Sequence, residues 1–203
     1  MLDRRPPLLS GLALALAMSA ASAEDRPPAM PTRDVVVTYK VDRPPPFTDT
    51  VAWLVAEGRI RTEGVNRRDR VAHLIDTRGN KVVVVLDKDR EYTDFGPLAA
   101  AMTMDYVFAR PGLTLTEEGS DTIAGEACTV WRIDPAGIDD PDSARHACIT
   151  ADGVPLRLVD GCGAAATTRY TATRVVYGPQ DPARFRPPAD YKHADTVGGA
   201  RRR

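Results

Sequence analysis

Short segments in which apolar and polar residues alternate recur along most of this chain, and Gly, Asn and Pro separate them. In Val35–Val41 every odd-numbered residue is Val or Tyr, and the even-numbered residues include Thr38 and Lys40. A period of two is typical of a β-strand that buries one face. Further strands are predicted at residues 51–56, 59–63, 70–76, 81–87, 113–117, 126–134, 145–151, 154–159 and 167–177.

Two of the separating segments predict tight reversals of the chain. Residues 77–80 carry the sequence Thr-Arg-Gly-Asn, and Asp152 with Gly153 joins two alternating segments. Gly and Asn tolerate the positive φ that a two-residue hairpin needs. We therefore expect successive strands to pair as antiparallel hairpins.

The strand predicted at 81–87 differs from the others because residues 82–86 are apolar on both faces. Such a strand is covered on both sides. A candidate cover follows directly, since Pro97 can begin a helix and residues 98–108 contain helix formers without Gly or Pro. We therefore predict an α+β fold, a curved and mostly antiparallel sheet with helical cover on its concave face.

The first 23 residues have the pattern of a secretory signal peptide. Arg4 and Arg5 precede an apolar stretch at 8–20, and Ala21 and Ala23 fit a small-residue cleavage site. The apolar stretch is shorter than the roughly 20 residues of a membrane-spanning helix. We expect cleavage after Ala23, a periplasmic location and a soluble mature protein that is not membrane-spanning.

Charge and length favour one soluble domain without nucleic acid as a partner. The 27 Lys and Arg residues are interspersed with 28 Asp and Glu residues, whereas a nucleic-acid site needs basic residues gathered on one face. The last basic residues, at 201–203, follow a Gly-rich segment. We expect a single domain at 30–192 and a disordered basic tail at 193–203.

Three segments resemble exported proteins of the lipoprotein-carrier superfamily, LolA/LppX. They are residues 124–133 (AGEACTVWRI), residues 148–157 (CITADGVPLR) and residues 185–191 (FRPPADY), the last with a Phe-x-x-Pro-x-x-Tyr spacing. The resemblance implies an unclosed β-barrel whose hollow, capped by helices, holds acyl chains in characterised members. It also implies that strands 126–134 and 145–151 are neighbours.

Export places the three cysteines in an oxidising compartment. Neighbouring strands, as the resemblance implies, allow Cys128 and Cys148 to form a disulfide, which leaves Cys162 over. No pair has the C-x-x-C spacing of a zinc or redox motif. We therefore predict a structural disulfide and no metal or cofactor.

An apolar hollow between helix and sheet uses the large apolar side chains best. Methionine adapts to irregular apolar ligands, so the helix would act as a lid and two tryptophans as walls. The alternative is that the same side chains fill an ordinary core. The candidate ligand-binding residues are Trp53, Leu98, Met102, Met104, Phe108 and Trp131.

Catalytic motifs are absent from the sequence. After the signal peptide only Ser120 and Ser143 remain as serines, and neither lies in a Gly-x-Ser-x-Gly motif. We therefore expect a non-enzymatic protein that binds a lipid, a lipidated protein or another apolar ligand. The alternatives are an envelope protein-interaction module with a filled core and, third, an exported hydrolase.

Overall fold

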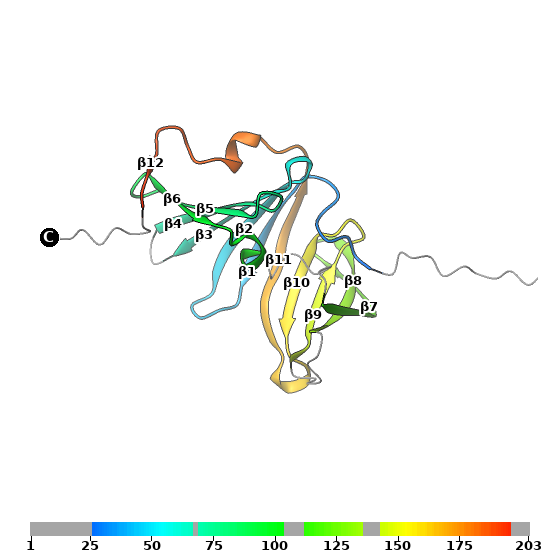
Figure 1. Cartoon of the computed structure of the whole chain (residues 1–203). Coiled ribbons are helices and arrows are strands. Elements are labelled where there is room, and N and C mark those ends of the chain that lie inside the picture. Colours follow the sequence, from blue (N-terminus) through cyan, green and yellow to red (C-terminus); the bar gives the residue numbers. More distant parts are fainter. Residues whose placement is uncertain (1–25, 67–68, 104–111, 136–142, 196–203) are drawn as a thin grey trace, which may run out of the picture.

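The computed structural model describes residues 26–66, 69–103, 112–135 and 143–195. These residues form one strongly curved sheet of 12 strands that does not close into a barrel (Figure 1). The predicted signal peptide, Met104, Phe108 and residues 196–203 lie outside the described residues. The strands are β1 (Val35–Val41), β2 (Phe47–Leu54), β3 (Arg59–Asn66), β4 (Asp69–Asp76), β5 (Lys81–Leu86), β6 (Glu91–Gly96), β7 (Leu113–Ile123), β8 (Glu126–Pro135), β9 (Arg145–Ile149), β10 (Pro155–Asp160), β11 (Thr167–Tyr177) and β12 (Lys192–His193).

The strand order places β1 near the middle of the sheet and makes two meanders around it. The order is β12-β6-β5-β4-β3-β2-β1-β11-β10-β9-β8-β7. From β1 the chain adds strands outward to β6, and from β7 it returns inward to β11. All neighbouring pairs are antiparallel except β12 with β6. The single ladder that joins the two meanders pairs Val35 with Tyr177 and Val41 with Tyr170.

One face of the sheet, here called the inner face, carries the main hydrophobic core. Alternate residues of the strands point into it, as the period-two pattern predicts. On β1 these are Val35, Val37 and Tyr39, none more than 1% exposed. Trp53 of β2 and Leu156 of β10 belong to the same cluster, so both meanders contribute to one core.

The opposite face, here called the outer face, is covered over β2–β6 by the C-terminal residues 180–194, which we call the strap (orange to red in Figure 1). Its short 3-10 helix η4 (Pro182–Phe185) begins with Asp181 accepting a hydrogen bond from the Ala183 N–H. Phe185 packs against Ala52 and Leu54, whereas Tyr191 packs against a second small cluster around Leu74. The strap then ends in β12, which pairs with β6.

The predicted α+β class is wrong for the described part of the chain. The helix predicted at 98–108 is represented there by α1, which has four residues (Ala99–Met102). The double-sided apolar pattern of β5 has a different cause. Val82 and Val84 lie in the inner core, while Val83 and Val85 lie on the outer face beneath the strap. The outer face of β5 is therefore covered by an irregular C-terminal segment and not by a helix.

The hairpin predictions are confirmed. Asn80 has φ +49° in the turn between β4 and β5, and Gly153 has φ +85° between β9 and β10. Two strands were not predicted: β6, which is largely polar, and β12, which has two residues. Within the described ranges, no helix has the length and apolar character needed to span a bilayer.

Candidate functional site

The structure brings three of the candidate ligand residues to the same core. Trp53 of β2 is 0% exposed and Trp131 of β8 is 7% exposed, and Met102 at the end of α1 packs against the same cluster. Trp53 lies between Val35 and Ile60 in the strand register, which fixes its side chain on the inner face. Trp131 is held in the same way opposite Ala147 of β9.

Leu98 is placed differently from these three residues. Its side chain is 44% exposed, immediately before α1. Met104 and Phe108 fall outside the described residues, so the lid that they were expected to form stays a prediction. Of the six candidate residues, the structure therefore places two tryptophans in the core and one methionine at its border, and the apolar hollow stays a prediction.

The border of the inner core consists of apolar side chains that are only partly buried. Most of them come from the two meanders, and all of them pack against the fully buried cluster. This border is the part of the inner face that an apolar molecule could contact without unfolding the sheet. Its members are Met30, Val55, Leu86, Met102, Leu113, Leu115, Val130, Val175 and Tyr177.

Two hydroxyl groups of the inner face are hydrogen-bonded within the protein. The Tyr39 hydroxyl donates to the carbonyl oxygen of Pro155 at 2.6 Å, and its ring meets that of Tyr170 edge-on at 4.8 Å. Thr62 Oγ1 lies 3.0 Å from Nδ1 of His73. Burial lowers the pKa of His73 below its ordinary value, because the charged ring would lose solvation there.

A polar cluster closes one end of the core where residues 26–33 cross the β9–β10 hairpin. Arg33 Nε donates to Asp152 at 2.6 Å and its guanidinium stacks 3.5 Å from the ring centre of Tyr177. Burial opposes ionisation of Asp152, but hydrogen bonds from Thr150 and Arg33 outweigh it and lower the pKa of this carboxyl. Burial, followed by the Asp152 charge, raises the pKa of Tyr177.

The disulfide implied by the family resemblance is present. Cys128 on β8 and Cys148 on β9 are joined, with Cα atoms 5.4 Å apart, within the normal range for a disulfide. Both residues lie in the main core. Cys162 is exposed on the loop after β10 and is not part of this bridge.

The two edges of the sheet differ in how they are covered. β6 pairs with β12, so its outer edge is capped by the end of the strap. β7 pairs with β8 alone among the described strands. Seven of its 11 residues are exposed, and a bulge between Glu117 and Gly119 interrupts its register. A long, open strand edge can accept a further strand.

Catalytic geometry is limited in the described residues. His146 Nδ1 lies 2.8 Å from Glu118 Oε2, and both side chains are partly exposed. This pair joins β9 to β7 across the sheet surface. No three His, Cys, Asp or Glu side chains come together as a metal site in the described ranges.

Comparison with known proteins finds similar folds but no similar sequence family. No protein-family model and no curated protein matches the sequence. Among solved structures, an uncharacterized conserved protein from Thermus thermophilus is 15% identical with a TM-score of 0.57, over 81% of this chain and 91% of that chain. MucB is 15% identical with a TM-score of 0.51, over 80% of this chain and 60% of MucB.

A weaker likeness involves a domain from Vibrio parahaemolyticus described as an outer membrane lipoprotein-sorting protein domain. It is 8% identical, with a TM-score of 0.33, over 75% of this chain and 89% of that one. The Thermus protein and MucB establish that the open, curved sheet occurs in other proteins. This chain spans less than two thirds of MucB. Identities this low establish the fold and nothing finer.

Proposed function

We propose that this chain is an exported, periplasmic binding module of the lipoprotein-carrier superfamily, and that it holds an apolar ligand against its inner face without catalysing a reaction. A lipid or a lipidated protein is the class of ligand that fits. The observation that carries the proposal is the apolar border of the inner core. Among the described residues of α1, only Met102 belongs to this border.

The energetics of such binding require no catalytic groups. Each methylene removed from water contributes about 0.8 kcal/mol, so several contacts along an acyl chain hold it without specific hydrogen bonds. The Tyr39 hydroxyl of the inner face is already paired with Pro155. An apolar ligand therefore leaves this hydroxyl satisfied.

The compartment is supported by two features of the chain. The N-terminal residues have the pattern of a signal peptide, and the Cys128–Cys148 disulfide persists in an oxidising space. Periplasmic carriers must keep acyl chains out of water, which is the task that a protected apolar face performs.

Mass spectrometry of organic extracts tests the proposal directly. The protein, purified from its native envelope without detergent, is expected to yield a reproducible lipid and to bind a fluorescent fatty acid. Met102→Ser removes an apolar contact at the border and should weaken uptake about fivefold. Val176→Ser, at a 42% exposed position, serves as the control. An empty protein that also fails to bind the fatty acid would contradict the proposal.

A second candidate function, an envelope protein-interaction module, is favoured by the open edge of β7. An extended partner segment can add a strand to such an edge through main-chain hydrogen bonds. A photo-reactive amino acid in place of Ser120, exposed on β7, should then crosslink a protein partner in living cells. The same group in place of Thr173, exposed on the central strand β11, should not. Equal crosslinking from both positions would contradict this function.

A further inference from the structure

The outer face contains a pocket that is separate from the inner core. It has a volume of ≈ 200 Å³ and lies where the strap crosses β4 and β5. Leu74 and Val83 line it from the strands, and Phe185 and Pro187 line it from the strap. Leu74 and Phe185 belong to different apolar clusters, so the strap bridges these clusters without filling the space between them.

Charged side chains also line this pocket, and most of them already have an ion-pair or hydrogen-bond partner within the protein. Arg59 pairs with Glu57 at 3.1 Å and donates to the carbonyl oxygen of Phe185 at 3.3 Å. Lys81 pairs with Asp94 at 2.6 Å. Asp76, the one carboxylate of the lining, accepts the backbone N–H groups of its own turn at 3.0 and 2.7 Å.

Arg186 is the exception among these charged groups. It lies in the strap between the two aromatic anchors, Phe185 and Tyr191, and lines the pocket. Its guanidinium makes no hydrogen bond or ion pair with the described residues. A guanidinium offers a fork of N–H donors that matches a carboxylate. The pocket therefore combines an apolar interior with one cation that is available to a ligand.

We propose that this pocket binds a small carboxylate with a compact apolar body, the carboxylate on Arg186 and the apolar part between Leu74, Val83 and Phe185. The volume agrees with this size, because a protein cavity of about 150 Å³ holds benzene. Benzoate has one ring and one carboxylate and suits both parts. The site is on the face opposite to the border of the inner core, so it stands independently of the proposed apolar carrier.

NMR titration of the purified protein with sodium benzoate tests the proposal. Backbone shifts are expected at Leu74, Val83 and the strap. Benzamide, which has the same shape without the charge, should bind about tenfold more weakly. Arg186→Gln should lower benzoate affinity by the same factor while leaving benzamide binding unchanged. Lys88→Gln removes a positive charge from an exposed turn outside the pocket and serves as the matched control.

A second variant tests the apolar part. Val83→Phe places a ring in the space that the ligand needs, and it should abolish binding of both compounds. Circular dichroism checks that Val83→Phe folds. If it does not fold, Arg186→Gln still tests the proposal, because it changes an exposed residue. Equal binding of benzoate by wild type and Arg186→Gln, or shifts confined to the inner face, would overturn the proposal.

Discussion

The two meanders of the sheet are stabilised by different means. Strands β2–β6 are covered on their outer face by the strap, which is attached by side-chain packing and hydrogen bonds. Strands β8 and β9 are joined by the Cys128–Cys148 disulfide, and residues 26–32 pack on the neighbouring hairpin. The strap can detach without breaking a covalent bond, whereas the disulfide persists in every conformation of the oxidised protein.

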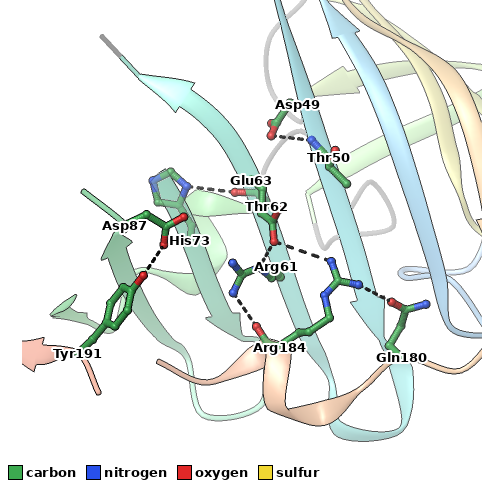
Figure 2. Close-up of polar contacts among 10 residues, drawn as sticks. All are labelled: Asp49, Thr50, Arg61, Thr62, Glu63, His73, Asp87, Gln180, Arg184 and Tyr191. Atoms are coloured by element: carbon green, nitrogen blue, oxygen red, sulfur yellow. Dashed lines mark hydrogen bonds and ion pairs between the residues drawn. The ribbon is translucent and has the colours of Figure 1, made fainter. Parts of the chain in front are cut away.

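The hydrogen bonds of the strap show how it can be firmly placed and still separable. Figure 2 shows Arg61 and Arg184 beside Glu63 on the outer face of β3. Arg61 Nη1 donates to the carbonyl oxygen of Arg184 at 2.7 Å, and Arg184 Nη1 donates to Gln180 at 3.1 Å. Near the other end, the Tyr191 hydroxyl donates to Asp87 at 3.2 Å. These contacts are partly solvated, so each contributes modestly.

The largest expected effect is on the strap anchor. Phe185→Ala removes a side chain that is 3% exposed and should lower the free energy of unfolding by about 4 kcal/mol. Urea denaturation measures this change. Phe47→Ala, at a residue 37% exposed, should change stability by less than about 0.5 kcal/mol. If both substitutions have the same effect, the strap does not stabilise the first meander.

The disulfide should have the next largest effect, confined to the second meander. Replacing Cys128 and Cys148 together by Ser opens a loop with a sequence separation of 20 residues and should cost about 3 kcal/mol. Cys162→Ser, on an exposed residue, should be neutral. Hydrogen exchange should show faster opening of β8 and β9 than of β4 and β5. Uniform acceleration would mean that the two meanders do not differ in this respect.

Contact between residues 26–32 and the β9–β10 hairpin can be measured with a matched pair of glycines. Gly153 has φ +85°, and a Cβ there would lie 2.8 Å from the Met30 carbonyl oxygen. Gly125 has φ +83° with nothing within 4 Å of that position. Gly125→Ala should cost about 1 kcal/mol through the backbone alone, and Gly153→Ala about 2 kcal/mol. Equal losses of stability would show that residues 26–32 move away from the hairpin at little cost in free energy.

The smallest effect is expected from His73 of the first meander. Its pKa is lowered by burial, so the unfolded chain binds a proton at higher pH than the folded protein does. The stability associated with the neutral ring is present above its ordinary pKa of 6.5 and is lost as pH falls below that value. Its strand neighbours on the inner face, Thr62 and Val84, carry no charge. His73→Gln should flatten the dependence of thermal stability on pH in this window, and an unchanged dependence would contradict the prediction.

The sequence predicts the strands well because each strand has its own local pattern. Alternation at Val35–Val41 and the turn at Asp152–Gly153 depend on neighbouring residues only, and both are present as expected. The cover of the sheet is a different matter. Residues 98–108 have the helix propensity, but covering the outer face of Val83 and Val85 depends on Tyr191, over 100 residues away. No pattern of neighbouring residues predicts this contact between Tyr191 and the two valines.

The candidate sites also divide into those that local sequence predicts and those that depend on distant contacts. Burial of Trp53 and Trp131 can be expected from their large apolar side chains, and the structure places both in one core. The outer pocket could not be predicted, because Arg186 meets Leu74 and Val83 only when the strap crosses the sheet. The Pro-rich sequence around Arg186 indicates an irregular segment and gives no sign of what lies beneath it.

The ladder between β1 and β11 also determines when the protein can finish folding. Each meander forms from neighbours in sequence, but β1 must wait for a partner that ends at Tyr177. Non-local pairing of this kind is slow because a long loop must close first. If the chain is exported as proposed, it crosses the membrane as an extended polymer, N-terminus first, and cannot complete this sheet until almost all of it has emerged.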